Sequence, residues 1–411
     1  MNFWQKLRYR ISRTMISLVI MACPWLQAQN VPYDCAALNS LTAELARAGN
    51  EQEQQKIIAK FVKYLPGNAP IIEGTQVTFV VVTDGREQTL MARRVEIFGD
   101  FTGWGEVKPM HRLTGTDLYW FTLTGVPRNA RIEYKFKLDE MDILDELNPV
   151  KVDNGVGGEN SLLVMPDYRP LSFTDDATIP HGAVKTVEFK SEILGNRRAV
   201  HIYTPPGYAE AGESVTYPVI YVHDGTQYLQ RARMARFVDF LIAVGKIEKL
   251  VLVFVDPVDR SREYSRSPEY TRLVVEELIP YVRKQVHITD VAAKTACMGA
   301  SLGGLIAFHL GFSHPEIFGL VISQSGAFGV PEQSLFRDLE AVPVKPLKLY
   351  FDIGIYDLRH DGHDLLEDNR KAEKILRQQG YDYLYYEYSG GHNWNSWQDQ
   401  FPSILEYLFK K

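Results

Sequence analysis

The chain has 411 residues with a hydrophobic content of 45% and a charged content of 23%, which is typical of a globular protein and not of a disordered or fibrous one. Its formal net charge of -6 argues against nucleic acid as a partner, since surfaces that bind nucleic acid are usually basic. A chain of this length can hold two domains of ordinary size.

The N-terminus has the pattern of a secretory signal. Basic residues between positions 6 and 13 precede an apolar run over 15–26, and Gln27-Ala28-Gln29 follows it. We predict that residues 1–28 are a signal peptide cleaved after Ala28, because the run is short for a membrane anchor and no other run could span a bilayer. We expect an exported protein, periplasmic or secreted. Cys23 also permits a lipoprotein, but Pro24-Trp-Leu26 is a poor spacer.

Residues 30–69 have leucine and isoleucine at helical spacing, which predicts a small helical segment. Residues 70–166 then favour strands, because β-branched and aromatic runs alternate with turn residues. We predict an all-β sandwich of about seven strands here. Trp104 and Trp120 could stack on a sugar or aromatic ligand, although buried aromatic side chains are commoner in such sandwiches.

A polar, turn-rich stretch over 167–180 is predicted to be a linker, and residues 181–411 form the second domain. Its continuously apolar runs alternate with helical patterns, which is typical of an α/β domain with a doubly wound, mostly parallel sheet. Functional residues in such sheets gather in loops at the carboxyl ends of the strands.

The strongest motif is Gly299-Ala-Ser301-Leu-Gly303, which follows an apolar run and precedes a helical pattern. This order is that of a nucleophile elbow, in which a serine on a tight strand-to-helix turn exposes its hydroxyl. The glycines leave room for a strained serine backbone. The backbone N–H of Leu302, at the start of the helix, is expected to face a developing oxyanion.

An acid and a histidine follow Ser301 in the order expected for an α/β-hydrolase. Asp357 comes just after a predicted strand, and His392 lies in a glycine-rich loop after the last one. His392 would take the serine proton, and Asp357 would hold its tautomer. The weaker candidates are other residues of the same types. For the acid they are Asp352, Asp361 and Asp364; for the base they are His309, His314, His360 and His363; and His223 is a second-choice substrate contact.

Two further features concern the pocket. We expect the backbone N–H of Thr226, in the loop after the predicted strand 219–223, to be the second oxyanion donor. Three arginines, Arg260, Arg262 and Arg266, follow another strand end and could meet a polyanionic ligand, or could simply pair with Glu263 and Glu269.

These motifs together resemble the esterase D family, and within it the enterochelin esterases. The resemblance rests on Gly-Ala-Ser301-Leu-Gly-Gly, His-Asp224-Gly225, Asp256-Pro-Val-Asp259-Arg260, Ser323-Gln-Ser-Gly326 and Gly-Gly-His392-Asn-Trp394. It implies a catalytic triad of Ser301, His392 and Asp357, with Asp224, Gly225, Arg260, Arg262 and Trp394 near the substrate. In the first domain, Gly99-Asp-Phe-Thr-Gly-Trp104 and Leu147-Asn-Pro149 resemble early-set, immunoglobulin-like modules.

The sequence therefore predicts an exported serine esterase that acts through an acyl-enzyme and needs neither metal nor cofactor. The favoured substrate is an iron-siderophore trilactone of the enterobactin type, and the alternative is a feruloyl or acetyl ester of a plant polysaccharide. A non-catalytic carbohydrate-binding protein is a third hypothesis, against which the complete Ser-Asp-His set argues.

Overall fold

We describe the protein from a computed structural model, which covers residues 35–83, 94–114, 116–171, 178–212, 214–341, 343–360 and 362–411. The predicted signal peptide and residues 172–177 of the predicted linker lie outside these residues. No helix in the described part of the chain is long and apolar enough to cross a membrane.

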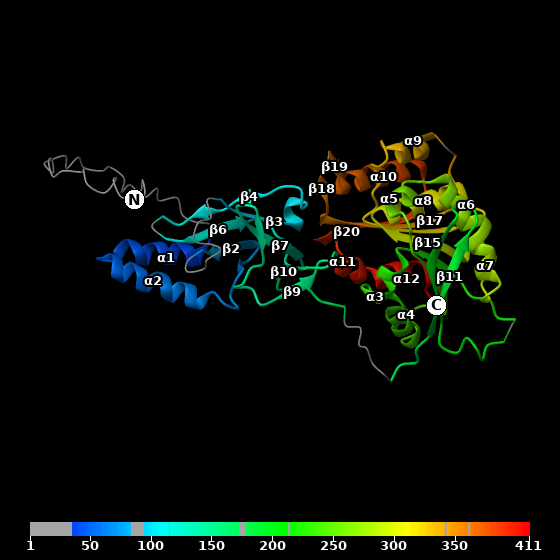
Figure 1. Ribbon diagram of the computed structural model, residues 1–411, viewed down its shortest axis with the longest axis horizontal. Coiled ribbons are helices and arrows are strands. Elements are labelled where there is room, and N and C mark those ends of the chain that lie inside the picture. The colour runs from blue at the N-terminus through cyan, green and yellow to red at the C-terminus, as the bar shows by residue number, and fades with distance from the viewer. Residues whose placement is uncertain are drawn as a thin grey trace, which may run out of the picture.

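Two helices, α1 (Ala36–Arg47) and α2 (Glu51–Tyr64), begin the described chain and lie at the far end of the first domain (Figure 1). Leu38 and Leu41 of α1 pack into a small core with Val80 and Leu118 of the adjoining sheet. The side chain of Asn50 caps α2 by accepting the Glu53 N–H. The leucine spacing in the sequence therefore corresponds to a helical hairpin that covers one sheet.

The first domain, which we call the β-module, contains two antiparallel sheets. The first has the order β1-β2-β6-β5, and the second β4-β3-β7-β10-β9, with β8 paired to β7. Their bounds are β1 Ile71–Glu73, β2 Gln76–Val82, β3 Val95–Gly99, β4 Lys108–Pro109, β5 His111–Arg112, β6 Leu118–Leu123, β7 Arg131–Leu138, β8 Met141–Ile143, β9 Lys151–Asp153 and β10 Glu159–Val164. Alternate side chains of both sheets, such as Phe79, Ile97 and Phe136, share one core.

The expectation of about seven strands was too low, since the described residues form these ten. The β-branched and aromatic runs over 76–82, 94–98, 118–123 and 131–137 match β2, β3, β6 and β7 closely. Five of the six additional strands are only two or three residues long, too short to display an alternating pattern; the sixth, β10, has six residues.

The second domain is built on one sheet of eight strands with the order β11-β12-β14-β13-β15-β16-β17-β20. The strands are β11 Ala183–Ser191, β12 Asn196–Thr204, β13 Val219–His223, β14 Val251–Val255, β15 Thr295–Ala300, β16 Leu320–Gln324, β17 Lys348–Tyr356 and β20 Asp382–Gly391. Neighbours from β14 to β20 run parallel, whereas β11 and β12 are antiparallel. The short pair β18 (Arg359–His360) and β19 (His363–Asp364) lies outside this sheet.

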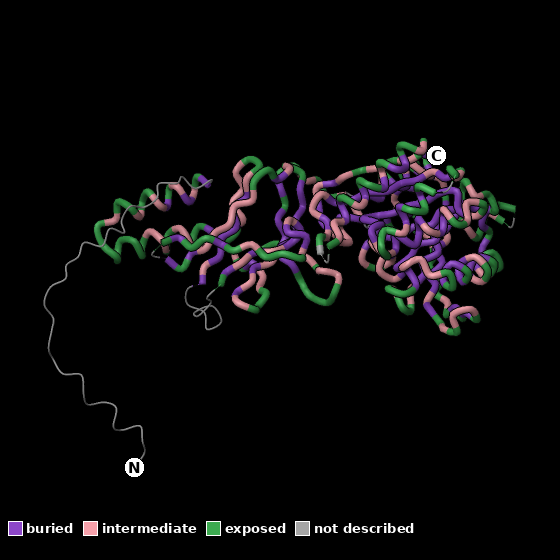
Figure 2. The backbone as a smooth tube through the Cα atoms, turned by 90° about the horizontal axis from the view of Figure 1, so that it is seen from above, coloured by how far each residue is buried: buried purple, intermediate pink, exposed green. Residues whose placement is uncertain are grey.

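Helices cover both faces of this sheet (Figure 1). They are α3 Gly225–Gln230, α4 Met234–Ala243, α5 Arg260–Tyr264, α6 Pro268–Arg272, α7 Ile279–Arg283, α8 Leu302–Ser313, α9 Ser334–Ala341, α10 Leu365–Gln379, α11 Trp394–Asp399 and α12 Phe401–Phe409. Successive residues of β13 enter opposite cores: Tyr221 packs in the cluster with α8, and Val222 in the cluster with α4 and α12. Buried residues therefore follow the strands, and exposed residues are common on α1 and α2 (Figure 2).

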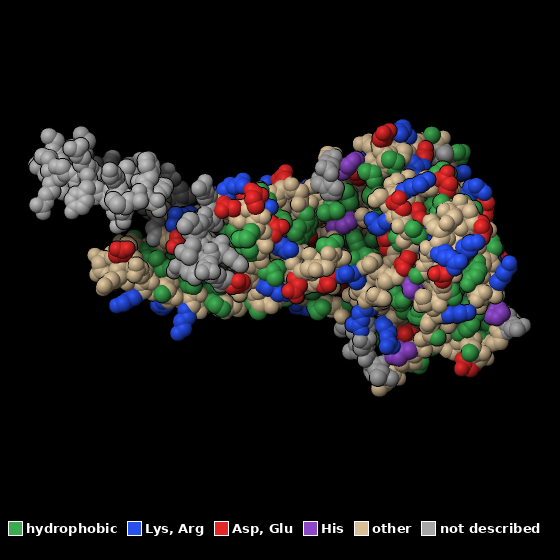
Figure 3. Space-filling model, viewed as in Figure 1, with side chains coloured by type: hydrophobic (Ala, Val, Ile, Leu, Met, Phe, Trp, Pro, Cys, Tyr) green, Lys and Arg blue, Asp and Glu red, His purple; other side chains and the backbone are tan. Residues whose placement is uncertain are grey.

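The β-module lies beside the β20 edge of the large sheet, so that the molecule is elongated (Figures 1 and 3). Polar contacts cross the junction: the Tyr168 hydroxyl donates to Asp399 at 2.7 Å, and Arg231 pairs with Asp153. Acidic and basic side chains are interspersed over the face in Figure 3, in line with the small net charge.

Candidate active site

Ser301 lies between the end of β15 and the start of α8, as the elbow motif predicts. Its backbone has φ 60° and ψ -123°, a conformation that costs energy for any residue with a side chain. A Cβ on Gly299 would lie 2.3 Å from the backbone carbonyl carbon of Gly303, so only glycine fits where the strand and helix cross. The Ser301 N–H donates to the Gln324 carbonyl at 2.9 Å, which fixes the turn against β16.

The predicted base and acid are hydrogen-bonded to one another. His392 Nδ1 lies 2.7 Å from Asp357 Oδ1, and the Asp357 side chain is buried. His392 follows β20, and Asp357 follows β17; both strands end at the same edge as β15 because they run parallel. The carboxylate thus fixes which imidazole nitrogen carries the proton, and Nε2 remains available as a base.

Sequence reasoning missed Ser325, whose Oγ donates to the other oxygen of Asp357 at 2.7 Å. The indole N–H of Trp397 in turn donates to Ser325 Oγ at 2.9 Å, and the Trp397 ring lies edge-to-face against the His392 ring. Ser325 belongs to the Ser-Gln-Ser-Gly motif that contributed to the family resemblance, but that motif does not indicate a contact with the acid.

One pocket of about 660 Å³ joins these groups. Its wall includes Ser301 and His392, and it takes residues from both domains. They are Asn154, Gly155, Val156, Asp224, Thr226, Gln227, Asp256, Pro257, Arg260, Ser301, His392, Asn393, Trp394 and Trp397. The β-module therefore supplies part of the pocket, which its composition could not reveal.

The two predicted oxyanion donors differ. Leu302 is the first residue of α8, where a backbone N–H has no partner within the helix. The Thr226 N–H is already used, since it donates to Asp256 Oδ1 at 2.6 Å, and the Thr226 hydroxyl donates to Asp256 Oδ2. Burial raises the pKa of Asp256, but the nearby His201 imidazole and the hydrogen bonds from Thr226 outweigh it and hold the pKa below the usual value. In this structure, Thr226 is not free to bind an oxyanion.

Only some of the predicted substrate-binding residues line the pocket. Arg260 lines the pocket, but its guanidinium forms a two-pronged pair with Asp224, with both N–O distances at 2.8 Å. Trp394 lines the pocket beside Gly155. Gly225 is buried and does not line it; a Cβ there would lie 2.5 Å from the Val255 nitrogen, so its role is close packing.

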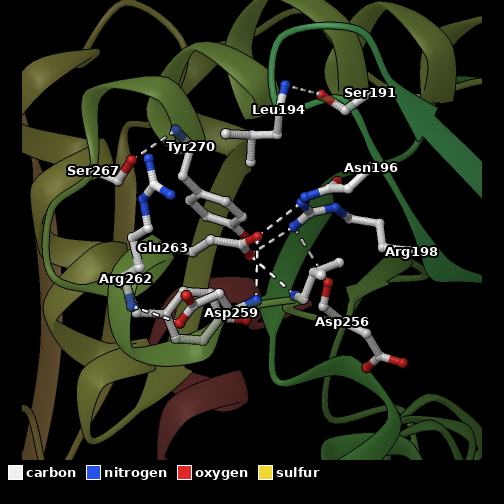
Figure 4. Close-up of polar contacts among 12 residues, drawn as sticks. Ser191, Leu194, Asn196, Arg198, Asp256, Asp259, Arg262, Glu263, Ser267 and Tyr270 are labelled. Carbon is white, nitrogen blue, oxygen red and sulfur yellow. Dashed lines mark hydrogen bonds and ion pairs between the residues drawn. The ribbon is translucent and has the colours of Figure 1, made fainter.

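Arg262 and Arg266 do not line this pocket, which corrects the expectation of an arginine cluster facing the ligand. The exposed Arg262 uses its backbone N–H to bond Asp259, and Arg266 reaches Ser334 and Asp338 instead. Figure 4 shows that Glu263 turns inward to Arg198, with N–O distances of 2.8 and 3.0 Å. The proposed pairing of these arginines with Glu263 is therefore wrong, because Arg198 of β12 occupies that carboxylate.

The buried pair of Arg198 and Glu263 explains how the loop after β14 is held. Backbone N–H groups of Val258 and Asp259 also point at Glu263, at 3.3 and 3.5 Å. The Asp256 carboxylate points away from this cluster (Figure 4), and it lines the pocket. The cluster thus anchors a loop whose first residue reaches the site.

His223 is wrong as a substrate contact. It is fully buried and its Nδ1 lies 3.0 Å from the Tyr270 hydroxyl. Burial, with a smaller effect of Arg198, lowers its pKa to about 3, so it stays neutral. Among the weaker acid candidates, Asp352 is fully buried inside β17, where burial raises its pKa to about 8. Within the described ranges, no cluster of three or more His, Cys, Asp or Glu side chains could hold a metal ion.

Comparisons with known proteins place the chain among esterases. Residues 191–408 match the family model Esterase, described as "Putative esterase". An iron(III) enterobactin esterase of Escherichia coli O6:H1 (strain CFT073) is 30% identical over 253 residues, which cover 55% of this chain and 62% of the relative. An endo-1,4-β-xylanase/feruloyl esterase of Xylanibacter ruminicola is 25% identical over 245 residues, which cover 56% of this chain and 32% of the relative.

Among solved structures, the enterobactin esterase of Shigella flexneri, determined in the presence of enterobactin, aligns with a TM-score of 0.65 and 25% identity. That alignment covers 81% of this chain and 92% of the other, and so includes more than the region matched by the family model. Since the family model alone covers more than half of the residues, the chain belongs to the Esterase ("Putative esterase") family.

Proposed function

We propose that this protein is a serine esterase in which Ser301, His392 and Asp357 form the catalytic triad. The observation that carries the proposal is the 2.7 Å contact between His392 Nδ1 and Asp357, in the same pocket as a serine with a strained, positive-φ backbone. A serine hydroxyl is a poor nucleophile until a base removes its proton, and a histidine oriented by a buried carboxylate supplies that base.

The chemistry proceeds in two halves. Ser301 Oγ attacks the ester carbonyl carbon while His392 Nε2 takes its proton, and the Leu302 N–H binds the negative oxygen of the tetrahedral intermediate. Collapse of the intermediate breaks the ester C–O bond, and His392 returns the proton to the departing alcohol. Water then attacks the acyl-enzyme by the same route and releases the carboxylic acid and free Ser301.

For the substrate, we put forward an iron-siderophore trilactone of the enterobactin type. The support is the likeness to enterobactin esterases, one of which aligns over most of both chains. The three arginines that follow β14 no longer support a polyanionic ligand, because Arg260 is already paired with Asp224.

A feruloyl or acetyl ester of a plant polysaccharide is the second candidate. One specific observation favours it: the pocket has two carboxylates, Asp224 and Asp256, and its arginine Arg260 is paired, which suits a neutral ligand better than a highly charged one. The Xylanibacter ruminicola relative adds to this. The third hypothesis, a non-catalytic carbohydrate-binding protein, has no support from the comparisons, which agree on an esterase.

The proposal extends to the rest of the chain. We assign the β-module to the early-set, immunoglobulin-like class, and we propose that its 154–156 segment contacts the substrate, since these residues line the pocket. Export by the N-terminal signal, to the periplasm or beyond the cell, completes the proposal.

The decisive experiment is hydrolysis of p-nitrophenyl acetate by the wild type, Ser301→Ala and the control Ser313→Ala. Ser313 lies in the last turn of the same helix, α8, and does not line the pocket. We expect only Ser301→Ala to lose activity, and a fluorophosphonate probe to label Ser301. Equal rates for the two variants, or a label elsewhere, would overturn the assignment. The candidate substrates are then compared by measuring hydrolysis of ferric enterobactin, methyl ferulate and acetylated xylan. If the enzyme does not cleave ferric enterobactin, the siderophore proposal is rejected.

A further inference from the structure

One turn of the β-module touches both loops that carry the proposed base and acid. This module turn comprises residues 99–104 and includes the short 3₁₀ helix η2 (Asp100–Thr102). It lies at the end of the module nearest β18 and β20 (Figure 1, cyan). On the acid loop, the Arg359 N–H donates to the Gly103 carbonyl at 3.2 Å, only two residues after Asp357.

On the base loop, Asp100 packs against Gly391, the residue before His392. A Cβ on Gly391 would lie 2.1 Å from Asp100 Cγ, so the carboxyl group occupies the space where a side chain would be. Asp100 is itself fixed: its Oδ2 accepts the Glu133 N–H at 2.7 Å, and its Oδ1 accepts the Trp104 indole N–H at 2.8 Å. The base loop therefore rests on a carboxyl group that cannot rotate.

A second contact lies on the other side of His392. Arg131 of β7 donates to Asn393 Oδ1 at 3.3 Å, and the same oxygen caps α11 by accepting the Ser396 N–H. Arg131 also lies 3.6 Å from Glu133, whose second oxygen accepts from Asn160. Both neighbours of His392 thus contact a buried polar cluster of the β-module.

This cluster is expensive to bury. Asp100, Glu133 and Arg131 are each less than one-tenth exposed. Burial, together with the nearby Glu133, raises the pKa of Asp100 well above its ordinary value. Replacing such groups by apolar ones often stabilises a protein, so packing stability alone does not account for them. The contact of these charged groups with the loop that carries His392 is a functional reason for their burial.

We propose that Asp100, supported by Arg131, is a positioning residue for His392, so that the β-module holds the catalytic base over Ser301. This inference rests on the proposed triad. Asp100 does not line the pocket and acts only through Gly391. The module is then part of the catalytic apparatus even for esters too small to touch it.

The test uses p-nitrophenyl acetate and the full chain. We expect Asp100→Gly to lower kcat at least tenfold while KM changes less than about twofold, and Asp100→Asn, which keeps the volume, to lower kcat less. The matched control is Asp145→Asn: Asp145 is equally buried in the β-module, but its contacts to Tyr134, Leu147 and Ser161 stay within that domain. The control is expected to keep its kcat within twofold, even if its melting temperature falls.

A second-site variant separates positioning from instability. Gly391→Ala alone should lower kcat, because its Cβ collides with Asp100. The double variant Asp100→Gly/Gly391→Ala should exceed Gly391→Ala in kcat at least fivefold, because the space is vacated. The inference would be overturned if Asp100→Gly lost no more kcat than Asp145→Asn. It would also be overturned if the fold-loss of kcat in the double variant equalled the product of the fold-losses in Asp100→Gly and Gly391→Ala. Full activity of Ser301→Ala would instead overturn the proposed function.

Discussion

Nδ1 of His392 lies 2.7 Å from Oδ1 of Asp357. Asp357 is held in turn, since its Oδ2 accepts from Ser325 Oγ and its Oδ1 also accepts from the Leu358 N–H. A carboxylate engaged on both oxygens cannot swing away from the imidazole. The loops that follow β17 and β16 therefore orient the His392 ring, and the proposed contacts of the β-module act on its backbone.

Removal of this carboxylate should slow the chemical step. We expect Asp357→Ala to lower kcat on p-nitrophenyl acetate by about 10²- to 10⁴-fold with little change in KM, because the imidazole loses its tautomer and its counter-charge. The control is Asp364→Ala in the same region, where Asp364 caps α10 by accepting the Glu367 N–H and pairs with Arg359, without contacting His392. That variant should lose about 1 kcal/mol of stability and keep its kcat. Comparable losses of kcat in both would mean that Asp357 is not the acid.

The Thr226 amide gives a second prediction. Its N–H donates to Asp256, and a carboxylate near a developing oxyanion is unfavourable. We expect Asp256→Ala to raise kcat on p-nitrophenyl acetate by about three- to tenfold, because the amide becomes free to bind the oxyanion. Asp259→Ala is the control, since Asp259 lies in the same loop and caps α5 instead. A fall in kcat for Asp256→Ala would show that the carboxylate orients the loop and that Thr226 is no donor.

The elbow and the positions of Asp357 and His392 could be predicted because they depend on local patterns. A glycine-flanked serine between an apolar run and a helical pattern has few alternatives, and parallel strands bring their carboxyl ends to one edge. The partners of charged groups could not be predicted, since Arg198, Arg260 and Arg262 all had several carboxylates within reach along the chain. Only the fold decides that Arg198 takes Glu263 and that Arg260 takes Asp224.

The same limit applies to the β-module. Gly155 contacts Trp394, and Asp100 contacts Gly391, across the junction between the two domains. The spacing of apolar residues along the sequence does not predict such contacts between domains. Short strands such as β4 and β5 were missed because two residues show no alternation. The sequence was thus informative about elements and motifs, and silent about how the two domains dock.

Asp399, at that junction, should make stability depend on pH. Burial raises its pKa to about 6, although the Tyr168 hydroxyl and Arg131 act in the opposite direction. A folded-state pKa above the unfolded value means that protonated Asp399 is favoured in the folded protein. Its contribution to stability is thus complete below about pH 4 and is lost as the pH rises to about 6.

We expect Asp399→Asn to remove this dependence. The variant should gain stability relative to the wild type as the pH rises from 4 to 7, by up to about 2–3 kcal/mol, since a shift of one pKa unit corresponds to about 1.4 kcal/mol. Melting temperatures of both proteins at several pH values measure this. A difference that is constant with pH, or that shrinks toward pH 7, would contradict the pKa of Asp399.

The 154–156 segment offers a test of whether the β-module contacts the substrate. Val156 is 88% exposed at the mouth of the pocket, beside Gly155, which contacts Trp394. An exposed position tolerates substitution, so Val156→Asp should fold normally. We expect it to lower kcat/KM at least fivefold for a large ester, ferric enterobactin or a feruloylated oligosaccharide, because a charge replaces an apolar contact. Hydrolysis of p-nitrophenyl acetate should be unchanged, because the acetyl group is too small to reach the segment.

The control is Val150→Asp. Val150 is an exposed valine of the β-module that does not line the pocket, so this substitution should affect the hydrolysis of neither kind of ester. If Val156→Asp and Val150→Asp have equal rates on the large esters, the segment does not contact the substrate.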